Sequence, residues 1–342
     1  MIKNFKSFVI LILISSCSSS NNDIYLTGNL KANYSNNEVI NFSVNDNHDS
    51  LAVYYSNKLV FKSNRQTKEN ISINLKDRRL GKNSVSIVIY TDNNYKKKNF
   101  EITLLNSKKP KLYDYRILKT YNHNIQSYTQ GLEFHDENLY ESVGRRGKSK
   151  LLITNFKTGR IIKEVKLKDK YFAEGLTILN DKIIQLSWTS KIGFIYDLNN
   201  LTLLNTFSYD KSEEGWGLCN DGDKIFKSDG SEKIWILNKD SLEEIDFIQV
   251  YTNKGRINGL NELEWVNGKI YANRYLKNGV AIINPKNGAV EGVIDFSNLI
   301  KNVTKHKDLD VLNGIAFNKI RNSLFVTGKL WDKIFEVELI EK

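Results

Sequence analysis

The second part of the chain repeats a unit of 42 to 52 residues, and this repeat restricts the fold more than any other feature. Each unit opens with a polar or aromatic residue followed by glycine or glutamate, and a β-rich run comes next. The openings are Gln130-Gly131, Glu174-Gly175, Trp216-Gly217, Asn261-Glu262 and Asn313-Gly314. In four units a second hairpin follows, with turns at 157–159, 198–200, 239–241 and 285–288. A period of about 40 to 50 residues with about four strands per unit predicts a β-propeller, here with five blades.

The two ends of this region indicate how the ring closes. The last unit ends with the β-rich run 333–339 and is one strand short, whereas the run 113–118 precedes the first unit and is one strand too many. Pairing these two runs would complete the last blade and remove a free sheet edge. The sequence therefore predicts a five-bladed β-propeller over 113–342.

The region before the propeller has a different pattern. Between 24 and 107, about seven short alternating runs are separated by turns rich in Asn, Asp, Ser and Gly; examples are 39–44, 51–55 and 84–90. This pattern predicts a small β-sandwich of immunoglobulin-like shape, followed by a linker at 108–112. We find no chemistry in it and expect a spacer or docking module. The predicted fold class is all-β throughout.

The first residues form a targeting segment. Lys3 and Lys6 precede the apolar run 8–14, which is too short to cross a bilayer as a permanent helix. The segment resembles a bacterial lipoprotein signal with the lipobox Ile14-Ser15-Ser16-Cys17. The resemblance implies a signal peptide over 1–16, fatty acylation of Cys17 (palmitate), a tether over 17–23 and a lipid-anchored protein of the bacterial cell envelope. The alternative is an ordinary signal peptide in which Cys17 is incidental.

Cysteine, histidine and charge patterns exclude several classes of protein. If Cys17 is acylated, Cys219 has no partner, so a hydrophobic core and not disulfides must hold the fold. The four histidines are scattered without metal-ligand spacing, and no metal site is predicted. The net charge of +11 comes from lysines spread over the chain, which favours a solvated surface that an anionic membrane face would attract. Nucleic acid is not an expected partner, because stacking aromatics are not interleaved with basic residues.

The repeat also predicts where polar residues converge. The innermost strand of each propeller blade faces the central channel, so equivalent positions form rings around it. The first ring would contain Gln130, Glu174, Trp216, Asn261 and Asn313. We expect a second ring at the far end of the same strands, formed by 143–144, Trp188, Asp229, 274–275 and 328–329. The sequence thus predicts a polar funnel with aromatic walls, of the kind that binds small ligands or chain ends.

Glu174 is the candidate for chemistry in this funnel. Burial beside indole rings disfavours the charged form of a carboxyl group and should raise its pKa, so that Glu174 can carry a proton at neutral pH. For several other residues, a purely structural role is the plainer interpretation. Trp216, and with it Trp265 and Trp331, could pack between blades, and the two asparagines of the first ring could be turn residues at strand entries.

Six motifs of the propeller region resemble those of the plant- and bacterial-type glutamine cyclotransferases, which are five-bladed propellers. They are Tyr128-Thr129-Gln130-Gly131-Leu132, Phe172-Ala173-Glu174-Gly175-Leu176, Gln185-Leu186-Ser187-Trp188, Glu214-Gly215-Trp216-Gly217-Leu218, Asn261-Glu262-Leu263-Glu264-Trp265 with Tyr271-Ala272-Asn273, and Leu312-Asn313-Gly314-Ile315-Ala316 with Val326-Thr327-Gly328-Lys329-Leu330-Trp331. They occur in order across some 230 residues. The N-terminal region lies outside the resemblance.

The resemblance implies an enzyme that converts an N-terminal glutamine into pyroglutamate with release of ammonia, and that needs no metal or other cofactor. Its partners would be peptides or proteins with N-terminal glutamine, and we expect a monomer. Glu174 matches the family's acidic catalytic residue. The polar pocket is matched by Gln130, Asn261 and Lys329, and the aromatic walls by Trp188 and Trp216. 

One position departs from the family. Tyr275 stands where the family usually has a tryptophan, fourteen residues after the pocket asparagine. Its hydroxyl could keep a hydrogen bond and part of the wall, but substrate fit would change.

The chemistry that these residues suggest is a proton transfer. Glu174 would take a proton from the α-amine and pass it to the leaving amide nitrogen, as a general base that becomes an acid. Lys329, with one or more side-chain amides, would polarise the carbonyl and hold the developing oxyanion.

Two other functions stay open at this point. A propeller lactonase or esterase would use Glu174, Asn261, Asn313 and Asp229 to bind a divalent cation such as Ca²⁺ that activates water. A non-catalytic module would use the funnel to hold a peptide or a sugar. A cyclisation assay on a Gln-dipeptide, with and without chelator, separates the three.

Overall fold

The computed structural model describes residues 23–64, 68–92 and 94–342, and most of them are in β-strands. This agrees with the all-β class predicted from the sequence. The predicted signal peptide and the lipidation site Cys17 lie outside the described residues. Within the described residues, no helix has the length and apolar character needed to cross a membrane.

Internal contacts divide the described residues into two compact units. One holds the residues up to Leu30 and those in 40–73 and 84–100, and the other holds 31–39, 74–83 and 101–342. The second unit thus includes two segments of the region predicted as a sandwich. The predicted boundary after residue 107 stays a prediction.

The N-terminal region contains eight strands, one more than the sequence suggested. A three-stranded sheet has the order β1 (Leu26–Thr27), β3 (Val39–Val44), β6 (Glu69–Asn74), and a five-stranded sheet has the order β2 (Asn33–Ser35), β8 (Asn94–Leu105), β7 (Gly81–Thr91), β4 (Ser50–Tyr55), β5 (Lys58–Ser63). Alternate residues of β3 are buried, namely Ile40, Phe42 and Val44. The alternation follows from the period of two along a strand, whose successive side chains point to opposite faces.

Three sheets of four strands come next, each with its strands in chain order. The first contains β10 (Thr129–His135), β11 (Asn138–Val143), β12 (Lys150–Asn155) and β13 (Arg160–Lys166). The second contains β14 (Ala173–Leu179), β15 (Lys182–Ser187), β16 (Ile192–Asp197) and β17 (Leu203–Ser208). The third contains β18 (Leu218–Asn220), β19 (Lys224–Ser228), β20 (Lys233–Asn238) and β21 (Glu244–Gln249).

The remaining strands form one sheet of eight. Its order is β22 (Leu260–Val266), β23 (Lys269–Arg274), β24 (Gly279–Ile283), β25 (Val290–Asp295), β9 (Lys111–Asn122), β28 (Lys333–Glu341), β27 (Ser323–Gly328), β26 (Leu312–Asn318); the 3-10 helix η1 (Leu299–Asn302) lies between β25 and β26. The predicted closure is confirmed, because β9 pairs antiparallel with β28 from Asn122↔Lys333 to Tyr113↔Glu341. The start of β9 also pairs parallel with β25, which the sequence analysis did not foresee.

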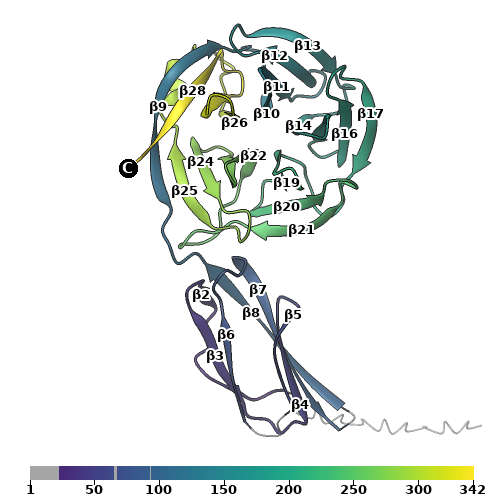
Figure 1. The fold of residues 1–342 in the computed structure, drawn as a ribbon, viewed down its shortest axis with the longest axis vertical. Helices are drawn as coiled ribbons and strands as arrows, with labels where there is room; N and C mark the ends of the chain where they lie inside the picture. The colour runs from purple at the N-terminus through teal and green to yellow at the C-terminus, as the bar shows by residue number, and fades with distance from the viewer. Residues whose placement is uncertain (1–22, 65–67, 93) are drawn as a thin grey trace, which may run out of the picture. The chain divides into compact units, whose positions relative to one another are not determined.

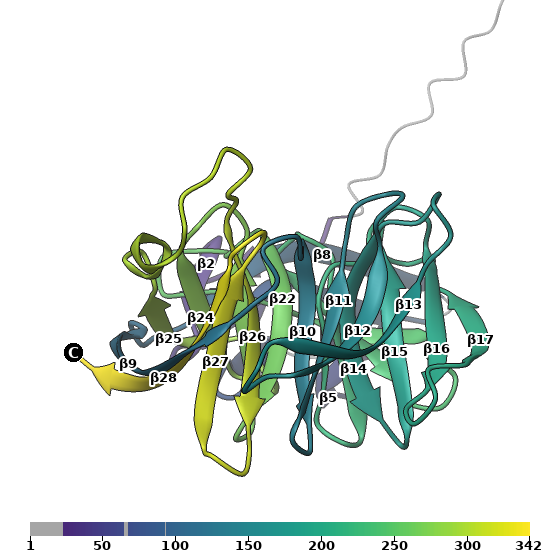
Figure 2. The same ribbon diagram turned by 90° about the horizontal axis from the view of Figure 1, so that it is seen from above.

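The first strands of the repeats contact one another in a closed circuit. β10 contacts β14, β14 contacts β18, β18 contacts β22, β22 contacts β26, and β26 contacts β10. Figure 1 shows the strands from β10 onward arranged around a common centre, with β17 and β21 on the outside of the ring. Figure 2 shows β10, β14 and β22 running alongside one another through its middle. The repeated openings of the sequence therefore meet around one axis.

The circuit is tight because glycines of the openings touch the next strand, and a Cβ on Gly131 would lie 2.5 Å from the Leu176 nitrogen. A Cβ on Gly175 would lie 2.6 Å from the Leu218 nitrogen, and one on Gly217 would lie 2.1 Å from the Asn261 oxygen. Contacts this short would force the backbones apart. The fourth opening has Glu262 in place of glycine, and its carboxylate accepts hydrogen bonds from the backbone nitrogens of Leu132 (3.3 Å) and Ile315 (3.0 Å).

The apolar core consists of separate clusters between neighbouring sheets. One joins Tyr140 and Ile153 to Leu176 and Phe194. All seven residues of β14 are buried, so this strand is covered on both faces, which explains why its sequence does not alternate between apolar and polar residues. The rigid packing fixes the ends of the inner strands, where the polar residues lie.

Candidate active site

Three residues of the predicted first ring form a hydrogen-bonded chain. Gln130 Nε2 donates to Glu174 Oε1 over 3.0 Å, and Asn313 Nδ2 donates to Gln130 Oε1 over 3.3 Å. A second bond from Asn313 Nδ2, 2.9 Å long, reaches the Thr129 carbonyl oxygen. All three side chains are buried. Strands β10, β14 and β26 thus bring together residues that are up to 183 positions apart.

Glu174 and Lys329 are a buried pair of opposite charges. Burial raises the pKa of the Glu174 carboxyl well above 4.5; the positive charge of Lys329 opposes this rise, and the negative charge of Glu214 adds to it. Burial also lowers the pKa of Lys329, against the attraction of Glu174 and Asp310. Both shifts follow from removing charges from water. Burial therefore disfavours the charged form of both groups.

Glu214 fixes the two predicted wall tryptophans. Its Oε2 atom accepts a hydrogen bond of 2.6 Å from Trp188 Nε1 and another of 2.6 Å from Trp216 Nε1. Two indole rings from different sheets are thus held by one oxygen atom. The sequence analysis quoted Glu214 in a motif but did not count it as a site residue. The available signal was its position two residues before Trp216.

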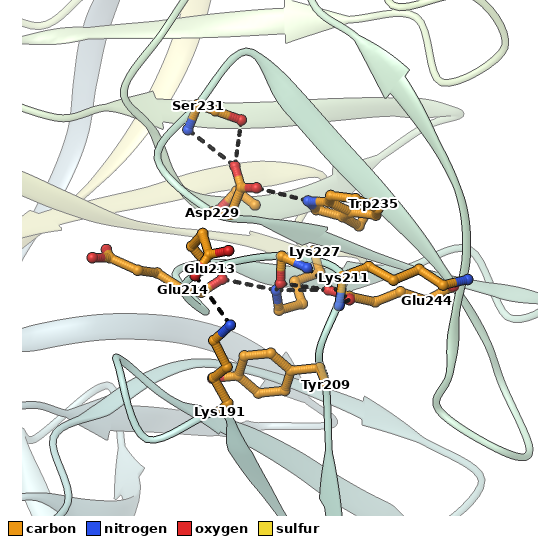
Figure 3. A network of polar contacts seen from close by, with 12 residues as sticks. Lys191, Tyr209, Lys211, Glu213, Glu214, Lys227, Asp229, Ser231, Trp235 and Glu244 are labelled. Atoms are coloured by element: carbon orange, nitrogen blue, oxygen red, sulfur yellow. Dashed lines mark hydrogen bonds and ion pairs between the residues drawn. The ribbon is translucent and has the colours of Figure 1, made fainter. Parts of the chain in front are cut away.

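A buried ion pair supports the backbone of Glu214 (Figure 3). Lys227 Nζ donates to the Glu214 carbonyl oxygen (2.9 Å), to Glu244 Oε1 (3.0 Å) and to the Ser212 hydroxyl. Burial alone would raise the pKa of Glu244, but Lys227 and Ser212 lower it below its usual value. The ammonium also lies 4.3 Å from the centre of the Tyr209 ring. This network positions the segment that carries Trp216.

Aromatic rings line the space around Lys329. Its Nζ atom lies 4.7 Å from the centre of the Tyr128 ring and 5.4 Å from that of Tyr275. Tyr275 contacts Trp216 edge to face at 5.5 Å and keeps 39% of its surface exposed. The Tyr128 hydroxyl donates to Asp310 Oδ2 over 2.9 Å. Tyr128 and Asp310 were missed as site residues, because nothing in their spacing marks them.

Two amide oxygens of the first ring lack a partner. Within the described part of the chain, Oδ1 of Asn261 and Oδ1 of Asn313 are buried and accept no hydrogen bond. An unsatisfied buried acceptor costs about 1 to 3 kcal/mol. Such atoms are suited to accept N–H groups of a ligand, which favours the site interpretation of both asparagines over a role in turns.

The second ring is not where the sequence analysis placed it. Trp188, Asp229, Tyr275 and Lys329 follow the ends of β15, β19, β23 and β27, the second strands of their repeats, and not the far ends of the first strands. Antiparallel pairing brings these ends back beside the first ring, as in the pairs Leu260↔Arg274 and Leu312↔Gly328. The prediction of the far end was therefore wrong, and both sets lie at one mouth.

Three other candidates have structural partners. Asp229 Oδ1 accepts bonds from the nitrogen and hydroxyl of Ser231, and its Oδ2 accepts one from Trp235 Nε1 over 2.7 Å (Figure 3). Its oxygens are thus occupied, which weakens its proposed role as a calcium ligand. Trp265 stacks on Phe226 at 5.6 Å. Trp331 is fully buried in an apolar cluster. Trp265 packs between two sheets, and Trp331 packs in the apolar cluster of the eight-stranded sheet, so both have the packing role of their plainer interpretation.

Trp216 also differs in detail from the expectation. Strand β18 begins at Leu218, so Trp216 precedes its strand, whereas Gln130, Glu174, Asn261 and Asn313 lie within theirs. Backbone bonds still hold it: its oxygen accepts from the Gly175 nitrogen (2.6 Å) and its nitrogen donates to the Ser228 oxygen (3.0 Å).

In residues 23–64, 68–92 and 94–342, no group of three or more His, Cys, Asp or Glu side chains is arranged to hold a metal ion.

Comparisons with known proteins point in the same direction as the geometry. The family model described as glutamine cyclotransferase matches residues 86–339. A glutaminyl-peptide cyclotransferase of Arabidopsis thaliana is 35% identical over 232 residues, which are 67% of this chain and 72% of the relative. The crystal structure of Myxococcus xanthus glutaminyl cyclase superposes with a TM-score of 0.64 at 33% identity, covering 68% of this chain and 100% of that one.

Proposed function

The chain belongs to the glutamine cyclotransferase family, and we propose that it converts the N-terminal glutamine of peptides and proteins into pyroglutamate with release of ammonia. The observation that carries the proposal is the buried Glu174 carboxyl, hydrogen-bonded to Gln130 and within electrostatic reach of Lys329. Around it stand two indoles fixed by one carboxylate oxygen. A small polar end group with several N–H donors fits this site.

Substrate binding uses the unpaired acceptors and the aromatic walls. The neutral α-amine and the side-chain carboxamide of an N-terminal glutamine both offer N–H groups to Asn261 Oδ1 and Asn313 Oδ1. Trp188 and Trp216 confine the glutamine side chain so that its nitrogen and Cδ approach each other. Holding the two groups in this geometry removes much of the entropic barrier to ring closure.

Glu174 moves the proton that the reaction requires. The neutral α-amine attacks Cδ of its own side chain; a C–N bond forms, and the attacking nitrogen gives one proton to the Glu174 carboxylate. Glu174 then gives this proton to the amide nitrogen, the old C–N bond breaks and ammonia leaves. The raised pKa of Glu174 suits the donation of this proton, because burial favours the protonated carboxyl group over its charged form.

Lys329 stabilises charge during the same step. Attack on Cδ places negative charge on the carbonyl oxygen, and a cation in a site shielded from water stabilises that charge strongly. Lys329 is buried and lies over the rings of Tyr128 and Tyr275.

The test is an assay of ammonia release from a Gln-dipeptide by the purified protein. Glu174→Gln should reduce kcat by on the order of 100-fold or more, because the proton carrier is lost. Glu213→Gln is the matched control, since Glu213 is a neighbouring, exposed carboxylate that pairs with Lys191. A Glu174→Gln variant as fast as the unmodified protein would contradict the assignment, and loss of activity with a chelator would favour the metal-dependent alternative.

We also propose that the repeats form five propeller blades and that the N-terminal region forms an immunoglobulin-like sandwich. The closed circuit of five first strands supports the count, with the eight-stranded sheet taken as two blades joined through β9. The two sheets of β1 to β8 support the sandwich. A crystal structure with six blades around the axis would contradict the count.

The lipid anchor stays a proposal based on the sequence. The lipobox ending in Cys17 supports attachment to the membrane of the bacterial cell envelope. Labelled fatty acid should be incorporated into the full chain and not into a Cys17→Ser variant. Equal labelling of both would contradict acylation at this residue.

A further inference from the structure

A second cavity, of about 630 Å³, lies beside the catalytic mouth. It is lined by residues that adjoin the site: Gly144 and Arg145 follow β11, and Leu330 follows Lys329. A Cβ on Gly144 would lie 2.9 Å from Gln130 Cγ and 2.5 Å from the Phe172 ring. The wall of this cavity and the wall of the catalytic funnel are thus the same segments of chain.

The lining of the cavity is cationic. It includes Arg145, Lys148, Lys150 and Lys166, and Asp308 is the single acidic residue among the lining residues described. Lys150 pairs with Glu164 and Lys166 with Asp169. Within the described residues, neither Arg145 nor Lys148 forms an ion pair with a carboxylate. Two positive charges are therefore free to meet a negatively charged ligand.

Tyr128 connects the cavity to Lys329. The Arg145 guanidinium lies 4.3 Å from the centre of the Tyr128 ring, and Lys329 Nζ lies 4.7 Å from the same centre. The separation of the two cations is at most the sum of these distances, which an extended peptide covers in about three residues. A peptide with its N-terminal residue beside Lys329 reaches Arg145 within that length.

The loop that carries Arg145 is held in a fixed shape. Arg145 has a φ of +87°, a left-handed conformation that residues other than glycine rarely adopt. The Gly144 nitrogen donates to the Tyr128 oxygen (2.9 Å), and the Lys148 nitrogen and the Ser149 hydroxyl both donate to the Arg145 oxygen (2.9 Å each). Backbone strain maintained in this way is typical of binding and catalytic segments.

We propose that this cavity is a subsite for acidic side chains at about the second to fourth positions of the substrate, so that the enzyme prefers peptides with Asp or Glu soon after the N-terminal glutamine. The proposal rests on the proposed cyclisation and adds a substrate preference to it. Free Arg145 and Lys148 supply the attraction, and the fixed loop supplies the position.

The experiment compares kcat/KM for three tetrapeptide amides, Gln-Ala-Glu-Glu, Gln-Ala-Ser-Ser and Gln-Ala-Lys-Lys, at low and high salt. The acidic peptide should exceed the neutral one by about three- to fivefold at low salt, mainly through KM, as for an exposed ion pair. The difference should shrink at about 0.5 M salt, because exposed charges are screened.

The matched variants are Lys148→Glu and Lys224→Glu. Both exchange an exposed lysine for glutamate and change the net charge equally, but Lys224 is the first residue of β19, at the end of that strand away from the mouth. Lys148→Glu should remove or reverse the preference, and Lys224→Glu should keep it.

Equal rates for the three peptides at low salt would overturn the proposal. Equal effects of the two variants would also overturn it, because the preference would then come from the overall charge of the protein. Cyclisation of the neutral peptide checks the proposed function separately. If that peptide reacts but no preference appears, only the subsite is rejected.

Discussion

Glu174 and Glu262 lie in the same central channel, yet their surroundings differ. Both carboxyl groups are buried, and burial raises the pKa of each well above 4.5. Glu262 accepts backbone N–H bonds from Leu132 on β10 and Ile315 on β26, so both its oxygens are satisfied by the fold itself. Glu174 accepts one bond from the side chain of Gln130 and lies near the charge of Lys329.

The difference shows that burial alone does not distinguish a catalytic carboxyl group from a structural one. A carboxylate that bridges the backbones of two strands contributes to the closure of the ring. A carboxyl group that contacts only side chains can exchange protons without disturbing the backbone. The partners, more than the pKa, therefore separate the two roles.

The sharpest test exchanges each carboxyl group for an amide. Glu174→Gln should lower kcat/KM by on the order of 100-fold or more, with little change in thermal stability. Glu262→Gln should lower the free energy of unfolding by about 1 to 3 kcal/mol, because an NH₂ group would face a backbone N–H. Denaturant unfolding and the Gln-dipeptide assay measure both effects. The comparison fails if Glu262→Gln is folded and inactive while Glu174→Gln is active.

Removing the charge of Glu214 tests how much this charge contributes to the raised pKa of Glu174. The charge of Glu214 raises the pKa of Glu174, so Glu214→Gln should move the acidic limb of the pH profile of kcat/KM to lower pH. Glu214→Ala should in addition raise KM by about tenfold, because both indoles lose their acceptor. An unchanged acidic limb in Glu214→Gln would show that Glu174 does not titrate there.

The pH dependence of stability tests Glu133, another buried carboxyl group with a structural role. Burial raises the pKa of Glu133 to about 7, against hydrogen bonds from Thr177 and Ile178 that lower it. A raised folded-state pKa gives stability that is fully present below the unfolded value near 4.5 and is lost as the pH rises through about 7. The free energy of unfolding should thus fall over this range, and less steeply in Glu133→Gln. Urea unfolding at several pH values measures the slope, and equal slopes would contradict the shift.

The smallest effect is expected at the rim of the funnel. Tyr275 is partly exposed and contacts Trp216 only edge to face. Tyr275→Trp should change KM for a Gln-dipeptide by no more than about threefold, with kcat nearly constant. A large change in kcat would mean that the Tyr275 hydroxyl takes part in the reaction.

The repeat positions made much of this site predictable. Gln130, Glu174 and Asn313 share a position in their repeats, so the propeller topology alone brings them together, and their hydrogen bonds agree. The pairing of β9 with β28 could be predicted for the same reason, from one surplus and one missing strand.

The remainder depends on side-chain directions that spacing does not encode. Glu214 is a site residue because two indoles from different sheets point at one of its oxygens. Asp229 shares its repeat position with Trp188 and Lys329, but its carboxylate accepts hydrogen bonds from Ser231 and Trp235 and so has a structural role. The pairing of β9 with β25 depends on where the chain enters the ring, which a repeat pattern does not show.

Strand β9 is synthesised long before the strands with which it pairs. It is made before all the propeller repeats, yet its neighbours β25 and β28 belong to the fourth and the fifth repeat. Its backbone N–H and C=O groups therefore have no strand partner while most of the protein is synthesised. Pairing between strands this far apart in the sequence is also slow. During that interval the unpaired β9 can pair with strands of other chains. Aggregation of newly made molecules is therefore a risk until the ring closes.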